Sequence, residues 1–461
     1  MIPLRLADLA DVVAGTLAEG SDGDAVVDAV TIDSRDATPG ALFVPLAGEH
    51  ADGHDFVPDA VARGASGYLW AEDRPVPSEP GAVVVDDPAD ALMGLGRWVR
   101  DEVDPLVVTI TGSQGKTTTK DMIAAAVGTS RVTVANQGSY NNELGVPLTC
   151  CRLQPDSEVL VAEVGARGIG HIAVLAEMLR PDVAVVTAVS AAHLELLGDI
   201  DTVARAKTEL VEALGPTGTA VLNADDQRVA AMAPRAPGAV VRYAVDGDAE
   251  WRAEDVTLDA QACARFTARG PSAAVAVELP MPGAHNVGNA LAAIAVADVC
   301  GVAPSDAAAG LASAQLSPWR MELHRRDDGV VVINDAYNAN PSSTAAALDT
   351  LAALTATRRW AVLGLMAELG PGSAQAHREI GQRCARLGID WLVPVGSDAE
   401  EIAAGARAAA FDGTIIPVDD AAGARDVLTA SMASGDAVLV KASRSVGLER
   451  LALELTGSQP A

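Results

Sequence analysis

The stretch Leu106-Val-Val-Thr-Ile-Thr-Gly-Ser-Gln-Gly-Lys-Thr-Thr118 joins an apolar run to a glycine-rich loop. The run predicts a buried strand, and residues 118–127 predict a helix. A glycine-rich loop between a strand and a helix is typical of a phosphate-binding loop, because main-chain N–H groups at the helix N-terminus attract anions. The spacing of Gly112 and Gly115 makes this loop shorter than the general pattern. We therefore expect phosphate binding by Gly112, Ser113, Gln114, Gly115, Lys116, Thr117 and Thr118, with the Thr117 hydroxyl available to Mg²⁺.

Strand and helix patterns alternate on the C-terminal side of this loop. Apolar runs predict strands at 159–164, 183–189, 220–222 and 240–244. Helical patterns at 201–214 and 285–300 accompany them, and we expect the helix at 285–300 to end the unit. Such alternation predicts a mostly parallel sheet covered on both faces, in a central domain of residues 105–316.

Two further domains flank the central one. In residues 1–104, short apolar runs alternate with Gly, Pro and Asp turns, which predicts a small α/β domain. Residues 317–461 hold apolar runs at 330–333, 360–363, 391–395, 414–418 and 437–440. Helical patterns separate these runs, which predicts another, smaller doubly wound domain of the Rossmann-like kind. The fold class is therefore α/β with three domains.

The composition argues against several classes of protein. The 461 residues carry a net charge of −29, and only 3% are aromatic. A nucleic-acid partner or an anionic membrane surface is therefore not expected. No apolar run reaches membrane-spanning length, Asp8 and Asp11 interrupt any signal-peptide core, and the five cysteines are scattered, so we expect a cytoplasmic protein with reduced thiols.

Lysine is rare in this chain. Among the 33 basic residues only Lys116, Lys120, Lys207 and Lys441 are lysines. A bias toward arginine explains the total, but lysine can lose its proton and be modified, which arginine cannot. Each remaining lysine is therefore a candidate site residue. For Lys120 a solvated helix position and a role beside the phosphates are equally open, and for Lys207 a solvated helix position is the alternative to a site.

Other candidates follow predicted strands. Glu163 ends an apolar run, where a second Mg²⁺ ligand belongs in a phosphate-loop domain, although a loop glutamate in an acid-rich chain is the commoner interpretation. His193 also follows such a run. Asn286 and Asn289 share one helix face and could either read an adenine edge or cap the helix.

The loop after the predicted strand 330–333 is the main candidate in the last domain. Asp335, Tyr337, Asn338 and Asn340 suit ligand binding at the carboxyl edge of a sheet, with turn and cap formation as the alternative. Arg320, shortly before, could reach a phosphate. No Gly-x-Ser-x-Gly elbow, no Gly-x-Gly-x-x-Gly after a strand and no zinc-ligand spacing occurs, which argues against a serine hydrolase, a nicotinamide enzyme and a zinc protein.

Together these segments resemble the Mur ligase family over nearly the whole chain. The resemblance rests on the loop 112–118, the segment 136–147, Glu163-Val-Gly-Ala, His193, Ala206-Lys207, the helix start at 285–289, Arg320 and 435–444. The segment Asp33-Ser-Arg to Asp52-Gly-His54 is similar to the UDP-sugar domain of the two later ligases of the family's pathway. Tyr337-Asn-Ala-Asn-Pro341 is similar to the dipeptide-adding member. Asn334, Leu365 and Ala442 depart from the family pattern of Asp, Asp and Gly.

The resemblance implies an ATP-dependent ligase. It would join D-alanyl-D-alanine to UDP-N-acetylmuramoyl-tripeptide through an acyl phosphate, in the cytoplasmic part of peptidoglycan synthesis and as a monomer. Domains 1–104, 105–316 and 317–461 would bind the UDP-sugar, bind ATP and complete the ligase site, respectively. A folylpolyglutamate-synthetase-like ligase and a nucleotide-binding protein without ligase activity are the alternatives.

The resemblance also implies a role for each candidate residue. Catalysis would rest on Lys116, Lys207, His193 and Arg320. ATP would also contact His285, Asn286, Asn289, Arg320 and Asp335. Two Mg²⁺ ions would be held by Thr117, Glu163, His193 and a carbamylated Lys207. The UDP-sugar peptide would contact Ser34, Arg35, Asn141 and Asn142, and D-alanyl-D-alanine would contact Tyr337, Asn338 and Asn340.

Overall fold

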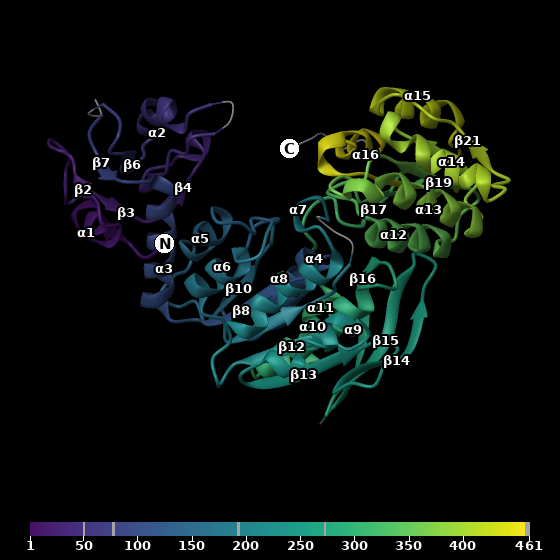
Figure 1. The fold of residues 1–461 in the computed structure, drawn as a ribbon, viewed down its shortest axis with the longest axis horizontal. Coiled ribbons are helices and arrows are strands. Elements are labelled where there is room, and N and C mark those ends of the chain that lie inside the picture. Colours follow the sequence, from purple (N-terminus) through teal and green to yellow (C-terminus); the bar gives the residue numbers. More distant parts are fainter. Residues whose placement is uncertain (49–50, 76–78, 191–193, 272, 457–461) are drawn as a thin grey trace.

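The computed structural model describes residues 1–461 except 49–50, 76–78, 191–193, 272 and 457–461. These residues form three α/β units, each built on a mostly parallel sheet, which confirms the expected fold class. In Figure 1 the N-terminal unit (purple) and the C-terminal unit (green to yellow) lie at opposite ends of the central unit. No helix in the described part of the chain is long and apolar enough to span a bilayer.

The N-terminal unit contains a five-stranded sheet. Its strands, in spatial order, are β2 (Thr16–Leu17), β7 (Ala82–Val85), β6 (Gly67–Ala71), β5 (Ala41–Phe43) and β4 (Ala29–Thr31). Strands β4 to β7 are parallel and β2 is antiparallel to β7. A separate pair, β1 (Leu4–Arg5) and β3 (Val26–Val27), and the helices α1 (Leu6–Val12) and α2 (Val57–Ala62) complete the unit.

Helix α3 (Pro88–Val103) connects the first two units. Asp87 caps it by accepting hydrogen bonds from the N–H groups of Ala89 and Asp90. Pro88 lacks an N–H group, but a residue in the first turn of a helix has no partner within the helix for that group. Its buried face lies in one hydrophobic core with residues of both units, and Arg100 Nη2 donates to the carbonyl of Met178, 2.7 Å away. The two units therefore share a core across α3, while the boundary after residue 104 stays a prediction.

The central sheet has nine strands. In spatial order they are β16 (Ala274–Pro282), β15 (Cys263–Arg269), β14 (Trp251–Leu258), β13 (Ala239–Ala244), β12 (Thr219–Asn223), β11 (Val183–Val186), β8 (Leu106–Thr111), β10 (Val159–Glu163) and β9 (Thr133–Ala135). Strands β14 to β16 were not expected from the sequence. Strand β15 is antiparallel to both of its neighbours, β14 and β16. The expected strand 183–189 ends at Val186, and the side chain of the next residue, Thr187, donates to the phosphate loop.

Helices cover both faces of this sheet. One face packs on α4 (Lys116–Val127), α10 (Asn286–Val299) and α11 (Pro304–Ala312). The other packs on α5 (Gly145–Cys150), α6 (His171–Leu179) and α8 (Ile200–Glu212), and the short helices α7 (Leu194–Leu197) and α9 (Gln227–Ala230) lie beside α8 and β12. Contrary to expectation, the long helix α10 does not end the unit, since α11 follows it and packs on α4 and β16.

The C-terminal unit has six strands. Their order is β17 (Glu322–Arg325), β18 (Val331–Asn334), β22 (Ala437–Lys441), β19 (Arg359–Leu363), β20 (Trp391–Pro394) and β21 (Thr414–Ile415). Only β17 is antiparallel to its neighbour. Regular strand structure in the expected strand 414–418 covers only Thr414 and Ile415, although the N–H groups of Ile416 and Val418 still donate to the carbonyls of Leu392 and Pro394. Helices α12 (Pro341–Ala353), α13 (Ser373–Arg386) and α14 (Glu400–Ala408) pack on one face, and α15 (Ala421–Ser431) and α16 (Glu449–Thr456) on the other.

Candidate active site

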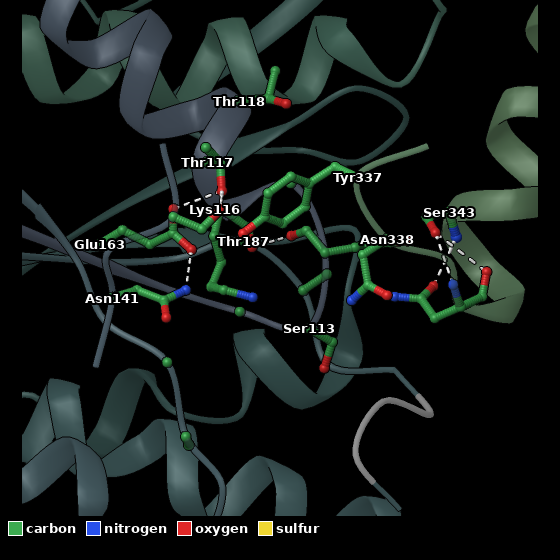
Figure 2. A pocket seen from close by; sticks show the side chains of 18 of the residues that line it. Ser113, Lys116, Thr117, Thr118, Asn141, Glu163, Thr187, Tyr337, Asn338 and Ser343 are labelled. Atoms are coloured by element: carbon green, nitrogen blue, oxygen red, sulfur yellow. Dashed lines mark hydrogen bonds between the residues drawn. The ribbon is translucent and has the colours of Figure 1, made fainter. Parts of the chain in front are cut away.

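A cavity of about 1100 Å³ lies between the central and C-terminal units. Both units contribute polar side chains to its wall, and Figure 2 shows those of the phosphate loop together with Tyr337 and Asn338. Among the residues singled out in the sequence, the wall contains Gly112 to Thr118, Asn141, Asn142, Glu163, Lys207, His285, Asn289, Arg320, Asp335, Tyr337, Asn338 and Asn340. The fold therefore brings most of the predicted residues to one place.

The phosphate loop leaves the end of β8 and turns through two glycines that cannot be replaced easily. Gly112 has φ +155°, and a Cβ atom there would lie 1.9 Å from Oγ1 of Thr187. Gly115 has φ +76°, and a Cβ atom would lie 2.7 Å from Oδ1 of Asn289. Thr187 Oγ1 donates to the carbonyl of Gln114 over 2.6 Å and so fixes the loop from the neighbouring strand. The loop geometry therefore depends on glycine at both positions.

Helix α4 begins directly after this loop, at Lys116. Lys116 and Thr117 thus occupy its first turn, where free N–H groups and the helix dipole favour an anion. Burial in the cavity wall lowers the pKa of Lys116, the Glu163 carboxylate opposes this shift, and the Arg320 guanidinium adds to it. Two cationic side chains, from two different units, therefore face the place where phosphates are expected.

Glu163 ends β10, the strand next to β8, and its carboxylate is buried. The Thr117 hydroxyl donates to Oε2 over 2.6 Å, and the Asn141 amide donates to Oε1 over 2.6 Å. Glu163 is therefore part of the cavity wall and not a loop residue in solvent.

Lys207 lies on α8 and is only 3% exposed, so the solvated position considered from the sequence is wrong. Burial, with a smaller contribution from the Lys116 ammonium, lowers the pKa of Lys207 to about 7. A large fraction of the amine is then neutral near pH 7, and a neutral amine can act as a nucleophile. His193, the other predicted partner here, lies outside the described residues.

Side-chain oxygen atoms near Lys116 are the candidate ligands of a divalent cation. Within the described ranges, no group of three or more His, Cys, Asp and Glu side chains could hold a metal. The Thr117 hydroxyl and the Glu163 carboxylate are hard oxygen donors in contact with each other, which suits Mg²⁺. An ammonium at Lys207 does not suit Mg²⁺, whereas a carbamate would add two oxygens. The residues therefore fit Mg²⁺ if Lys207 is a carbamate.

The two asparagines of α10 differ in position. Asn289 lines the cavity, but Asn286 is fully buried and does not. Asn286 Nδ2 donates to the carbonyl of Pro282, its Oδ1 accepts from Asn289 Nδ2, and Asn289 Oδ1 accepts from Thr119. This chain of amides attaches α10 to α4. The amide of Asn286 is thus used inside the protein, and its expected contact with ATP stays a prediction.

Arg320 enters the cavity from the start of the C-terminal unit. Its neighbours Trp319 and Met321 have φ of +61° and +51°, a left-handed conformation that is costly for such side chains. The Arg320 guanidinium lies 4.1 Å from the ring centroid of Tyr337, and Nη2 donates to the hydroxyl of Ser139 over 2.7 Å. Arg320 thus links the two units across the cavity.

The loop after β18 surrounds an ion pair between Asp335 and Lys441. Asp335 Oδ2 lies 2.5 Å from Lys441 Nζ, and Oδ1 accepts from the N–H of Met321. Lys441 Nζ also donates to the carbonyl of Asn338. Asn340 caps α12 in a reciprocal arrangement with Ser343, so its cap role is real, and its side chain also lines the cavity.

The three departures from the family pattern are accommodated locally. Asn334 is buried and donates to Glu322 Oε2 over 3.1 Å. The carbonyl of Leu365 accepts from the N–H of Ser443. The Ala442 methyl lies where a Cβ on Gly364 would be 2.8 Å away, so glycine at 364 makes room for alanine at 442.

Besides Asn286, two further predicted residues are not part of this cavity. Ser34 and Arg35 belong to the N-terminal unit, where Arg35 Nη2 pairs with Asp33 Oδ2 at 2.5 Å. Ser139, Thr187, Ser443 and Arg444 line the cavity but were not assigned a role from the sequence. Ser139 and the pair at 443–444 lie in segments already compared with the family, whereas Thr187 carries no local signal.

Three family models match the chain in order. The Mur ligase family catalytic domain matches residues 26–92, the Mur ligase middle domain 110–297, and the Mur ligase glutamate ligase domain 319–444. A UDP-N-acetylmuramoyl-tripeptide–D-alanyl-D-alanine ligase of Mycobacterium tuberculosis is 40% identical, over 98% of this chain and 97% of that protein. The chain belongs to the Mur ligase family. A ligase of the same name from Bacillus subtilis is 34% identical over 99% of both chains.

Solved structures of Mur ligases agree with this assignment. A crystal structure of MurF from Acinetobacter baumannii superposes with a TM-score of 0.88, at 31% identity over 99% of both chains. The MurF ligase from Thermotoga maritima in complex with ADP gives a TM-score of 0.80, at 27% identity over 93% of this chain and 97% of that one. The three-unit fold of this Mur ligase therefore has solved counterparts over almost its whole length.

Proposed function

We propose that this Mur ligase joins D-alanyl-D-alanine to UDP-N-acetylmuramoyl-tripeptide with consumption of ATP. The two relatives of this name described above are 40% and 34% identical over nearly the full chain. The observation that carries the proposal is one cavity that holds a phosphate loop on one wall and Arg320, Tyr337 and Asn338 on the other. ATP and the amino substrate can then meet the same carboxylate.

The reaction requires activation of a carboxylate. A tripeptide carboxylate oxygen attacks the γ-phosphorus of ATP, the bond to ADP breaks, and an acyl phosphate forms. The amine of the dipeptide then attacks the acyl carbon, loses a proton and expels phosphate, which leaves an amide. No protein nucleophile is needed, so the chain has to position and neutralise charge. Lys116 and Arg320 supply positive charge from the two sides of the cavity.

Mg²⁺ would be held by the Thr117 hydroxyl, by Glu163 and by Lys207 as a carbamate, with two ions expected. When bound, the cation neutralises the negative charge of the phosphates. The lowered pKa of Lys207 supports the carbamate, because only a neutral amine reacts with CO₂. His193 remains a further proposed ligand, outside the described residues.

The other substrate contacts are proposed from position. Tyr337, Asn338 and Asn340 would receive D-alanyl-D-alanine, and Asn141 and Asn142 the peptide of the UDP-sugar. His285, Asn289 and Asp335 would contact the nucleotide. Ser34 and Arg35 would bind the UDP-sugar on the N-terminal unit, which must therefore approach the cavity. Because the reaction uses ATP and all five cysteines are free and buried, we place the enzyme in the cytoplasm. We also propose that the enzyme is a monomer.

One assay tests the proposal against its alternatives. ATP hydrolysis to ADP and phosphate should require both UDP-N-acetylmuramoyl-tripeptide and D-alanyl-D-alanine. Turnover with a folate and glutamate instead would support the other ligase class, and nucleotide binding without any amide product would indicate a binding protein. A DNA or vesicle binding assay should give no signal, as the net charge of −29 predicts.

A further inference from the structure

Lys120 is one of four lysines in the chain, and neither expectation from the sequence describes it. It lies on α4, one turn after Lys116, and is 1% exposed. Its side chain is not part of the cavity wall. Lys120 is therefore neither a solvated helix residue nor a phosphate ligand, and its burial needs another explanation.

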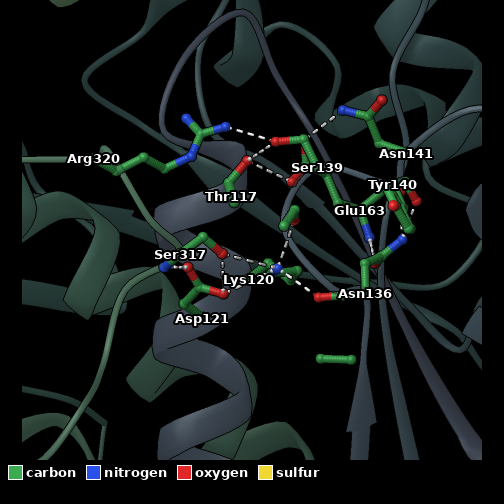
Figure 3. Close-up of polar contacts among 12 residues, drawn as sticks. Thr117, Lys120, Asp121, Asn136, Ser139, Tyr140, Asn141, Glu163, Ser317 and Arg320 are labelled. Carbon is green, nitrogen blue, oxygen red and sulfur yellow. Dashed lines mark hydrogen bonds and ion pairs between the residues drawn. The ribbon is translucent and has the colours of Figure 1, made fainter. Parts of the chain in front are cut away.

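Oxygen atoms surround the buried ammonium, as Figure 3 shows. Lys120 Nζ donates to the carbonyl of Asn136 over 2.7 Å and to the carbonyl of Gly138 over 2.8 Å. It lies 3.0 Å from Oδ1 of the neighbouring Asp121. A compact ammonium with three donors suits this arrangement of oxygens, whereas the flat, longer guanidinium of arginine does not.

The two carbonyls belong to a loop that carries the polar contacts of the active site. Asn136 Oδ1 accepts from the N–H of Glu163 over 2.6 Å. Ser139 Oγ lies 3.3 Å from Thr117 Oγ1 and accepts from Arg320 Nη2. Asn141 Nδ2 donates to the Glu163 carboxylate. The position of the loop therefore decides where these side chains stand.

Asp121 extends the same network to the C-terminal unit. Its Oδ2 accepts from the N–H of Ser317 over 2.7 Å, and its Oδ1 accepts from the Ser317 hydroxyl over 3.1 Å. Ser317 precedes Arg320 by three residues and starts the connection to the last unit. Lys120 and Asp121 thus join helix α4, the loop 136–141 and the connection at Ser317 at one buried point.

We propose that Lys120 is a positioning residue of the ligase reaction. Its ammonium holds the loop 136–141 against α4, so that Ser139 and Asn141 keep their places beside Thr117, Glu163 and Arg320. Without the ammonium, two carbonyls would lose their donor in a buried place, the Asp121 carboxylate would lose its cationic partner, and the loop would move to reach water. The kinetic part of this inference rests on the proposed function, whereas the effect on the loop does not.

The test compares Lys120→Met with Arg100→Met. Arg100 is a matched control, because it is also buried, donates to a main-chain carbonyl and neighbours an aspartate, but lies at α3, away from the cavity. Both variants should lose thermal stability. Only Lys120→Met should speed amide hydrogen exchange in residues 137–142, about tenfold or more, and lower kcat about 100-fold, as expected when reacting groups are displaced. Arg100→Met should keep kcat within about twofold and leave that exchange unchanged.

A double-mutant cycle with Ser139→Ala separates positioning from general damage. If Lys120 acts through the loop, Ser139→Ala alone lowers kcat about tenfold. Lys120→Met then lowers kcat by a clearly smaller factor in the Ser139→Ala protein than in the wild type. Independent, multiplicative losses would overturn the proposal, as would unchanged exchange in residues 137–142. If Lys120→Met does not fold, unchanged kcat in Ser139→Ala overturns it alone. If the wild-type protein shows no ligase turnover, the proposed function is wrong. Hydrogen exchange in residues 137–142 then tests the role of Lys120 alone.

Discussion

The hydroxyl of Thr117 donates to Oε2 of Glu163 over 2.6 Å, and this contact joins the phosphate loop to the neighbouring strand. The contact exists because β8 and β10 are adjacent and parallel, so that the carboxyl ends of both strands lie at one edge of the sheet. The two oxygens hold each other in the place that we propose for a divalent cation.

Glu163→Gln should therefore raise the Mg²⁺ concentration needed for half-maximal activity and lower kcat by about 100-fold. The amide keeps the shape of the side chain and removes the charge that a hard cation needs. The measurement is steady-state turnover over a Mg²⁺ titration. Glu158→Gln is the control, because Glu158 lies just before the same strand at its opposite end, where it accepts from the N–H of Val132. Equal Mg²⁺ curves for all three proteins would contradict the metal assignment.

Lys207→Arg and Lys207→Ala should both lose nearly all activity. Arginine stays protonated and cannot form a carbamate, and alanine has no amine. Addition of acetate or formate should partly restore the alanine variant but not the arginine variant, since only alanine leaves room for a carboxylate. A fully active Lys207→Arg enzyme would disprove the carbamate.

The lowered pKa of Lys207 gives this prediction a pH dependence. With a pKa of about 7, the amine is protonated below pH 7 and neutral above it. Enzyme stripped of CO₂ should therefore be reactivated by CO₂ roughly ten times more effectively at pH 8 than at pH 6, at equal dissolved CO₂. A recovery that does not change with pH would mean that Lys207 is not the group modified.

Tyr337 should contribute through its ring. The Arg320 guanidinium lies over that ring, and such a contact is worth about 0.5–2 kcal/mol. Tyr337→Phe should keep kcat/KM for D-alanyl-D-alanine within about threefold, whereas Tyr337→Leu should lower it about tenfold. If leucine and phenylalanine behave alike, the stacked position of Arg320 has no part in catalysis.

The N-terminal unit should show an acid-sensitive contribution from Asp52. Although burial opposes the shift, hydrogen bonds from His54 and Arg74 lower the pKa of Asp52 to about 2. A carboxylate whose pKa is lowered in the folded state stabilises the fold above the unfolded-state pKa near 4. This stabilisation is lost as the pH falls toward 2. Asp52→Asn should lower the free energy of unfolding by roughly 1–2 kcal/mol at pH 7 and by clearly less at pH 3.

Urea unfolding at both pH values measures the effect. The exposed Asp36 gives the control, since its side chain makes no hydrogen bond or ion pair with another described residue. Asp36→Asn should change stability little at either pH. An Asp52→Asn penalty that is the same at pH 7 and pH 3 would show that its carboxylate charge does not matter.

The sequence predicted those parts of the site that local spacing determines. The phosphate loop was predictable because its strand, glycines and helix are contiguous, and Glu163 because it ends a clear apolar run. Thr187 could not be found, because its role arises only when β11 pairs with β8. Lys120 could not be interpreted, since its partners lie 16 and 18 residues later in the chain and Asp121 binds a residue 196 positions away. Strands β14 to β16 lack the buried apolar runs of the parallel strands, as much of β14 is exposed, and they were missed for that reason.

Helix α3 also determines how the molecule comes apart. Its apolar face belongs to one core with both the N-terminal and the central unit, whereas almost all residues of the two cores around the C-terminal sheet come from that unit itself. Calorimetry should therefore resolve two cooperative melting transitions and not three, the first two units melting together. A chain shortened to residues 105–461 would expose part of that joint core and should aggregate, so the N-terminal unit also serves as a folding partner of the central one.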